Sequence, residues 1–304
     1  MRVGVPVGPR PVDWVLAIYS AVAGAAWIPA LRVSAAAPWI LGAHMLGTLL
    51  PLALPALDRG APRPVRVLRE AYPLLLLYPL FAEVGLLHRA LGSSGYDAAI
   101  MAWDAAMFPG AWHRTWASAA PGAWFRESMH ALYVSYYVLI AGPPLVAALL
   151  RRADAFRDIS YRMMLTYTAC YAVYLFLPVF GPGHADPLPS GAAAQGFFPA
   201  LMRAAMASGD APGTAFPSSH VAGAFTAAWL GARWFPRYVS RLQLVMAIGV
   251  AAATVYTHNH YTLDAAAGFV FALALQRGLA PAIDRGFGNA KAPGNDRSPA
   301  PAKP

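Results

Sequence analysis

Charged residues are scarce in this chain. Only 12% of its 304 residues are Asp, Glu, Lys or Arg, whereas 58% are hydrophobic and the mean hydropathy is +0.45. Soluble domains carry about a quarter charged residues, so the composition excludes an ordinary soluble protein and indicates an integral membrane protein. The length fits one compact helical bundle with terminal extensions better than two domains.

Cysteine is nearly absent as well. Cys170 is the single cysteine, and it lies within an apolar run. One thiol cannot form an internal disulfide, and we interpret this residue as a small apolar side chain.

Long apolar runs dominate what is present. Their hydropathy predicts an all-α, polytopic membrane bundle of about eight transmembrane helices. The first run is followed by Ala35-Ala36-Ala37, which resembles a signal-peptide cleavage site, but its apolar region is too long for a signal peptide. The predicted spans are Val12–Leu31, Pro38–Leu57, Tyr72–Leu91, Glu127–Leu150, Ser160–Phe180, Ser218–Phe235, Leu242–Thr257 and Tyr261–Ala280.

The net charge of +9 reflects membrane topology rather than nucleic-acid binding, because the basic residues lie between apolar runs and not in one patch. Eight crossings place both termini on one side, together with most of the 23 lysine and arginine residues. Basic residues concentrate in cytoplasmic loops, so we expect the other face to point outward. That face holds Arg32, Arg89, Arg114, Arg126 and Arg203.

Two outward segments are longer than simple loops. Gly92–Arg126 contains four tryptophans, and we expect short helices in the outer interface with a break at Pro109-Gly110. Gly181–Gly213 contains a short apolar stretch, Phe197–Met206, and leads into the first of two polar motifs.

These motifs are Phe216-Pro217-Ser218-Ser219-His220, at the start of the sixth span, and His260-Tyr261-Thr262-Leu263-Asp264, at the start of the eighth. Two apolar runs separate them, and each run crosses the bilayer once. Both motifs therefore lie at the same membrane face. We interpret their meeting point as an active site.

The residue types suit phosphoryl chemistry. His260 and Asp264 are four residues apart, so on a helix the carboxylate can hold one imidazole nitrogen while the other acts. Serines at a helix N-terminus add hydroxyls to unpaired N–H groups that bind phosphate, and His220 can donate a proton to a leaving group. Each motif alone is common as a helix cap or as packing, but together two histidines and an aspartate at membrane depth indicate function.

Pro217-Ser218-Ser219-His220 resembles the second signature of the type 2 phosphatidic acid phosphatase (lipid phosphate phosphatase) superfamily, and His260 to Asp264 resembles its third. The string His258-Asn259-His260-Tyr261-Thr262-Leu263-Asp264 is similar to the branch of inositol phosphorylceramide synthases (inositolphosphotransferases) and sphingomyelin synthases. Trp103-Asp104, Met107-Phe108-Pro109 and the series His130, Tyr133, Tyr136-Tyr137 also resemble bacterial members of that branch. The likeness is specific over Gly181–Phe269 and diffuse from Tyr72 onward.

The resemblance implies a phosphatase-like catalytic core of six helices. It implies that His260 attacks phosphorus to form a phosphohistidine, with Asp264 orienting it and His220 protonating the leaving oxygen. Ser218 and Ser219 would hold phosphoryl oxygens. The family needs no metal, no cofactor is implied, and the sequence has no carboxylate cluster that indicates a metal.

The chain departs from the family pattern in its basic residues. The first signature's Lys and Arg are missing at Leu177–His184, and the Arg of the third signature is Thr254. A phosphoryl group still needs cationic or hydrogen-bonding partners. We expect them among His184, Arg203 and Arg126, with His184 and Arg203 as the phosphate-binding candidates; the alternatives are a loop histidine and an interfacial arginine.

Other polar residues within the spans are weaker candidates. Glu83 and His130 are costly in a bilayer unless they are paired. His130, Tyr133 and Tyr137 share a helical face that could line a headgroup groove or serve only in packing. His258 is at most a support for the site.

The sequence therefore predicts an enzyme that acts on a phospholipid or lipid phosphate at the outer face of a membrane, which we expect to be the bacterial inner membrane. The acceptor is a lipid hydroxyl or water, so transfer and hydrolysis both remain open. Rival interpretations are a proton-coupled lipid transporter, for which we find no internal repeat, and a non-catalytic membrane protein. We expect a transmembrane hairpin over residues 1–70, the lipid phosphatase/phosphotransferase-like domain over 71–280 and a disordered cytoplasmic tail over 281–304.

Overall fold

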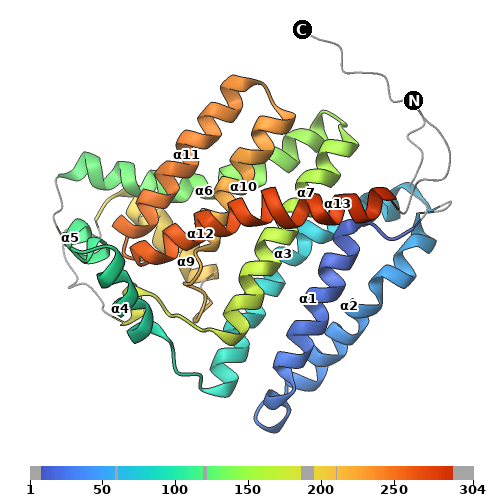
Figure 1. The fold of residues 1–304 in the computed structure, drawn as a ribbon, viewed down its shortest axis with the longest axis horizontal. Coiled ribbons are helices and arrows are strands. Elements are labelled where there is room, and N and C mark those ends of the chain that lie inside the picture. Colours follow the sequence, from blue (N-terminus) through green and yellow to red (C-terminus); the bar gives the residue numbers. More distant parts are fainter. Residues whose placement is uncertain (1–7, 59–60, 119–121, 186–194, 210, 290–304) are drawn as a thin grey trace.

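The computed structural model describes residues 8–58, 61–118, 122–185, 195–209 and 211–289. Within these ranges the structure is all-α, as predicted: it has no strand and only one isolated bridge, between Val179 and Thr214. The helices form an elongated bundle (Figure 1).

Each predicted span corresponds to a long helix. These helices are α1 (Pro11–Trp27), α2 (Ala37–Leu57), α3 (Arg63–Leu91), α6 (Ala123–Leu149), α7 (Ala153–Phe176), α10 (Ser219–Trp234), α11 (Arg237–Tyr256) and α12 (Thr262–Ala274). A short 3-10 helix, η1 (Pro29–Arg32), follows α1, and a π-helical turn at Leu275–Leu279 joins α12 to α13 (Ala280–Asn289).

Six of the described helices are long and apolar enough to cross a membrane, judged by length and composition. They are Pro11–Arg32, Ala37–Ala56, Arg63–Leu91, Ala123–Leu149, Arg237–Tyr256 and Thr262–Phe287. The other two predicted spans are α7, which carries several charged residues in its first turns, and α10, which has only 16 residues. These two helices form the centre of the bundle, where neighbouring helices rather than lipid surround them.

The centre is tightly packed because α10 is built from small residues. Its buried face carries Ala222, Gly223, Ala224, Ala227, Ala228 and Gly231. Small residues let membrane helices approach closely. As a result α10 contacts α6, α7, α11 and α12, while α7 also packs against α1 and α3.

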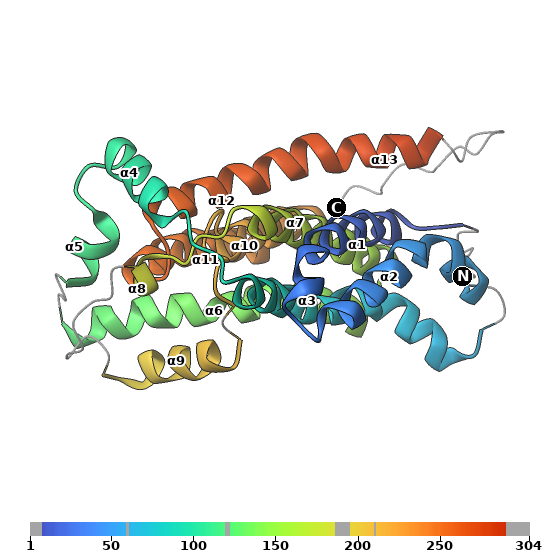
Figure 2. The same cartoon turned by 90° about the horizontal axis from the view of Figure 1, so that it is seen from below.

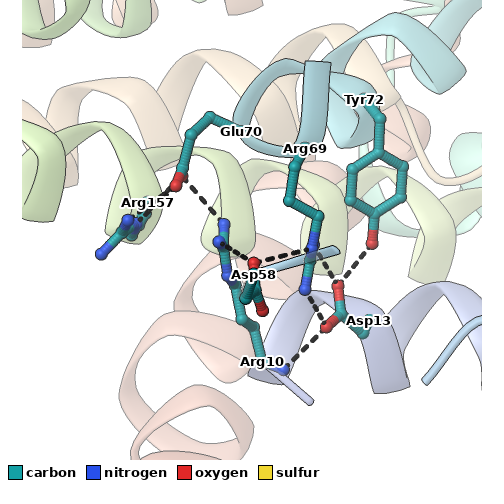
Figure 3. A network of polar contacts seen from close by, with 7 residues as sticks. All are labelled: Arg10, Asp13, Asp58, Arg69, Glu70, Tyr72 and Arg157. Carbon is teal, nitrogen blue, oxygen red and sulfur yellow. Dashed lines mark hydrogen bonds and ion pairs between the residues drawn. The ribbon is translucent and has the colours of Figure 1, made fainter. Parts of the chain in front are cut away.

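The N-terminal hairpin of α1 and α2 lies beside α7 and α3 and is held by a polar network (Figure 3). Arg69 pairs with both oxygens of Asp13, at 2.9 and 2.6 Å. Arg10 bridges Asp58 and Glu70, each at 2.9 Å. Because Arg69 and Asp13 are fully buried, each charge needs its partner, and the network fixes the hairpin to the bundle.

The same end of the bundle holds the turn between α10 and α11 and the end of the last helix. Arg233 pairs with Asp158 at 3.0 Å. We predicted disorder from residue 281 onward, but α13 continues to Asn289 because Asp284 pairs with Arg162 and Ile283 packs on the core. The rest of the predicted tail, 290–304, lies outside the described residues.

The opposite end carries the short helices α4 (Asp97–Met107), α5 (Trp112–Ser118), α8 (Pro182–Ala185) and α9 (Phe197–Gly209) (Figure 2). The break between α4 and α5 falls at the predicted Pro109-Gly110. Glu127 accepts hydrogen bonds from the first two amides of α9, both at 2.9 Å, which anchors this helix to α6. These short helices surround the ends of α10 and α12 that carry the two motifs.

Candidate active site

His260 and Asp264 meet at the N-terminus of α12. Nδ1 of His260 lies 3.5 Å from Oδ2 of Asp264, and both side chains are buried. The same Oδ2 accepts a hydrogen bond of 2.8 Å from the amide of Tyr261, so the carboxylate caps the helix as well. The carboxylate of Asp264 therefore lies beside the imidazole of His260 and also caps the start of the helix.

His220 enters from the first turn of α10. Its ring centroid lies 5.7 Å from that of His260, in an edge-to-face arrangement. Two tyrosines of α6 flank it: the Tyr136 ring lies 4.4 Å away and the Tyr133 hydroxyl lies 3.2 Å from Nε2. The two predicted catalytic histidines thus face each other across a short gap.

Ser218 and Ser219 differ in their surroundings. Ser218 is fully buried as the N-cap of α10, and its hydroxyl accepts from the amide of Val221 at 3.3 Å. Ser219 lines the cavity beside the histidines, and its amide donates to the Tyr174 hydroxyl at 3.0 Å. Ser219 is therefore the better placed of the two to meet a ligand in the cavity.

Two glycines allow the segments of the site to approach closely. A Cβ on Gly268 would lie 2.4 Å from the carbonyl oxygen of Ser218, so only glycine lets α12 press against the first motif. Gly181 has a φ of +86°, and a Cβ there would lie 2.9 Å from the carbonyl oxygen of Asn259. The end of the fifth predicted span therefore joins the site as a third wall.

Two carboxylates from α4 organise this arrangement, and the sequence interpretation did not single them out as site residues. Asp97 accepts hydrogen bonds from the amides of Phe180 and Gly181, at 3.0 and 2.8 Å. Asp104 is buried and accepts from the amide of Leu263 at 2.7 Å, in the first turn of α12. Their spacing of two helical turns puts both on one face of α4, which is the signal that could have revealed them.

A buried histidine supports Asp104. Nδ1 of His113 lies 3.4 Å from Oδ2 of Asp104, and the His113 ring stacks on His258 at 5.7 Å. His258 in turn donates from Nδ1 to the carbonyl of His113 at 2.8 Å. His258 therefore points away from the cavity and supports α5.

A cavity of about 890 Å³ opens beside His220 and His260, the two candidate catalytic histidines. Its wall is strongly aromatic and includes Tyr78, Tyr133, Tyr136, Tyr137, Tyr167 and Tyr171. His184 also lines it and stacks on Phe180 at 5.1 Å. Among the described residues that line the cavity there is no lysine or arginine.

The remaining candidates lie elsewhere. Arg203 is exposed on α9 and is not among the lining residues, and Arg126 donates to the carbonyl of Gln195 at 2.9 Å. His130 bonds the carbonyl of Arg126 rather than facing the cavity. Glu83 pairs with His44 at 3.0 Å, between α3 and the N-terminal hairpin.

The cavity opens sideways. Tyr78 on α3 and Tyr137 on α6 both line it, yet their side chains are 58% and 40% exposed. Both helices pack on α7, but over the described residues they scarcely pack on each other. Both α3 and α6 are long and apolar enough to cross a membrane, so this side of the cavity lies between two candidate membrane spans.

Burial changes the acidity of the candidate nucleophile, which lies between α11 and α12. It lowers the pKa of His260 from 6.5 to about 4, against the opposing effect of a hydrogen bond to the Ala215 backbone. The imidazole is therefore neutral at neutral pH. Within the described ranges, no three His, Cys, Asp or Glu side chains gather as metal ligands.

The fold and the site define an integral membrane protein in which two histidines and an aspartate meet beside an aromatic cavity. A family model described as the PAP2 superfamily matches residues 98–277. The chain belongs to this superfamily, whose members are generally phosphatases, and it is accordingly an enzyme of the phosphatase type that acts on phosphoesters. Neither a search of curated proteins nor a search of solved structures finds a significant match.

Proposed function

We propose that the protein transfers a phospho-alcohol group, of the inositol-phosphate type, from a phospholipid to the hydroxyl of a second lipid. His260 attacks phosphorus as the bond to the lipid oxygen breaks, and His220 gives that oxygen its proton. The acceptor hydroxyl then attacks phosphorus, its proton passes to His220, and the bond to His260 breaks. Asp264 holds His260 throughout.

The absence of lysine and arginine from the described lining of the cavity carries this proposal. A phosphomonoester has a charge of about −1.5 to −2 at pH 7, because its second pKa is near 6. A phosphodiester has a single negative charge. Burial of uncompensated charge is costly, so a cavity whose only potential cations are imidazoles suits a diester donor better than a monoester.

The sideways opening supports a lipid for both substrates. A phospholipid can enter between Tyr78 and Tyr137 without leaving the bilayer, and its headgroup then reaches His260. The aromatic wall offers ring faces and hydroxyls to a polyhydroxylated headgroup. We place this reaction at the outer face of the bacterial inner membrane, because the basic residues concentrate at the opposite end of the bundle.

Hydrolysis is the second candidate, and membership of a superfamily of phosphatases favours it. Its first half is the same, and water replaces the lipid hydroxyl in the second half. His184 and Ser219 line the cavity and would contact the phosphoryl oxygens in either reaction, and Ser218 would support them through the helix cap.

One assay separates these candidates. Purified protein in nanodiscs is incubated with labelled phosphatidylinositol, phosphatidylcholine and phosphatidic acid, each with and without ceramide or diacylglycerol. We expect a new phospholipid only where an acceptor is present. Release of inorganic phosphate or free phospho-alcohol without an acceptor would instead establish hydrolysis. Product that forms equally with the His260→Ala variant would overturn both.

A further inference from the structure

The hydroxyl of Tyr133 contacts a ring nitrogen of His220, the predicted proton donor. The Oη atom of Tyr133, on α6, lies 3.2 Å from Nε2 of His220, on α10, and the two ring centroids are 5.2 Å apart. Tyr133 is only 2% exposed, so its ring has little room to move. Nevertheless, it lines the cavity. The contact therefore lies at the wall of the cavity.

The other described neighbours of His220 do not form a hydrogen bond with a ring nitrogen. Tyr136 covers the imidazole with its ring, at 4.4 Å, but its hydroxyl pairs with that of Tyr167 at 2.7 Å. His260 presents its ring edge-to-face at 5.7 Å. Nδ1 of His220 has no hydrogen-bond partner in the part of the chain that the structure describes. Tyr133 alone thus distinguishes one nitrogen of His220 from the other.

We propose that Tyr133 is a positioning residue that engages Nε2 of His220 and so leaves Nδ1 as the nitrogen that exchanges protons with the leaving and entering oxygens. This inference rests on the proposed function. An imidazole ring can rotate about its bond to Cβ, and a fixed hydrogen bond removes this freedom before the substrate arrives. Orientation of reacting groups in advance lowers the barrier for proton transfer.

The proton balance is simple. In the first half, the proton on Nδ1 of protonated His220 moves to the leaving oxygen as the oxygen–phosphorus bond breaks and the bond from His260 to phosphorus forms. In the second half, neutral Nδ1 takes the proton of the entering hydroxyl as that oxygen binds phosphorus and the bond from His260 to phosphorus breaks. The Tyr133 hydroxyl keeps its own proton throughout and only orients the ring.

The test uses leaving groups that differ in their need for a proton. Phenyl dodecyl phosphate and p-nitrophenyl dodecyl phosphate are both monoanionic diesters, but p-nitrophenolate is a stable anion that leaves without protonation. We expect Tyr133→Phe to lower kcat for the phenyl ester about 30-fold and for the p-nitrophenyl ester less than about 3-fold. The ratio of the two rates, measured in full-length protein, reports proton transfer rather than folding.

Two tyrosine variants serve as comparisons. Tyr161→Phe removes the hydroxyl of a buried tyrosine in the N-terminal half of α7, which is the end opposite the candidate site. We expect wild-type rates with both esters. Tyr136→Phe removes a hydroxyl that bonds Tyr167, and we expect an unchanged ratio whatever its effect on the rate.

The outcomes separate the two proposals. If Tyr133→Phe keeps the wild-type ratio while His220→Ala changes it, Tyr133 does not act through His220 and this inference falls alone. If phenol release is equal in wild type and His260→Ala, the phosphohistidine is wrong and both proposals fall.

Discussion

The amide of Ser218 donates a hydrogen bond of 3.0 Å to the carbonyl of Asp264. This bond joins the two polar motifs main chain to main chain, although two long helices separate them in sequence. The geometry of the candidate site therefore depends on backbone contacts between helix ends as well as on side chains.

The first prediction concerns the three proposed catalytic residues. His260→Ala, His220→Ala and Asp264→Asn should each reduce turnover at least about 1000-fold, because nucleophile, proton donor and orienting carboxylate act as a unit. Size-exclusion profiles and thermal unfolding in detergent check that each variant folds.

The neighbouring histidine provides the control for these variants. His258 has a φ of +60°, a conformation that asparagine tolerates, so His258→Asn should fold and retain activity within about fivefold. Near-normal turnover by His260→Ala would show that the nucleophile lies elsewhere.

Asp104 gives the second prediction. Asp104→Ala leaves the amide of Leu263 without its buried acceptor, which costs about 1–3 kcal/mol of unfolding free energy and loosens the start of α12. Asp104→Asn keeps an acceptor oxygen and should be clearly milder in both stability and activity. Denaturation monitored with a dye, alongside kcat, measures both effects. Equal stability of wild type and Asp104→Ala would refute this role.

The close contact at Gly268 leads to the third prediction. Gly268→Ala forces α12 away from the Ser218 carbonyl and should reduce activity at least about tenfold, with a destabilisation of about 1–3 kcal/mol. Gly42 on α2 is the matched control, because nothing lies within 4 Å of a Cβ there. Gly42→Ala should be neutral or slightly stabilising, as expected for alanine in a helix. An active, stable Gly268→Ala variant would contradict this role of the glycine.

The fourth prediction concerns pH. Burial lowers the pKa of His260 from 6.5 to about 4, so the neutral nucleophile should persist down to about pH 5. With p-nitrophenyl dodecyl phosphate, whose charge does not change in this range and whose leaving group needs no proton, kcat/KM should stay level from pH 7 to 5 and fall only near pH 4. A fall centred near pH 6.5 would mean that the imidazole is well solvated.

The lowered pKa of His260 also makes the stability of the folded protein depend on pH. Because the folded-state pKa lies below the unfolded value, protonation of His260 favours the unfolded chain. Its contribution to stability therefore declines as the pH falls from 6.5 toward 4. Thermal unfolding across this range, in wild type and His260→Ala, isolates the contribution of this residue.

The fifth prediction concerns topology. In a Cys170→Ala background, Ser94→Cys probes the loop at the site end of α3, and Arg237→Cys probes the turn at the start of α11. A membrane-impermeant maleimide added to intact cells should label Ser94→Cys at once and Arg237→Cys only after permeabilisation. The reverse pattern would place the site on the cytoplasmic face.

Much of the fold follows from local sequence properties. Apolar runs, glycine and proline positions and polar motifs at helix starts predicted each long helix and the proximity of His220, His260 and Asp264. The PAP2 superfamily, inferred from Pro217–His220 and His260–Asp264, is confirmed by the match over residues 98–277. The synthase branch, the transferred group and the roles of the site residues stay predictions.

Long-range pairings could not be predicted in the same way. The contact of Asp104 with Leu263 depends on how an interfacial helix folds back over α12, and the contact of Tyr133 with His220 depends on the rotation of α6 against α10. Hydropathy reports whether a residue is near lipid, but not which helix it faces. α13 was missed for a similar reason, because the pairing of Asp284 with Arg162 stabilises a segment whose own composition resembles a tail.

The polar network of the N-terminal hairpin limits where the chain can be truncated. Glu70 pairs with Arg157 of α7 as well as with Arg10. The buried Arg69 pairs with Asp13 and Asp58, so removal of the residues before 61 would leave Arg69 buried without either partner. It would also remove the contact of Tyr19 with Tyr171, a residue that lines the cavity. The hairpin thus supports one residue of the cavity wall, and we expect a shortened chain that retains His220, His260 and Asp264 to lose that support.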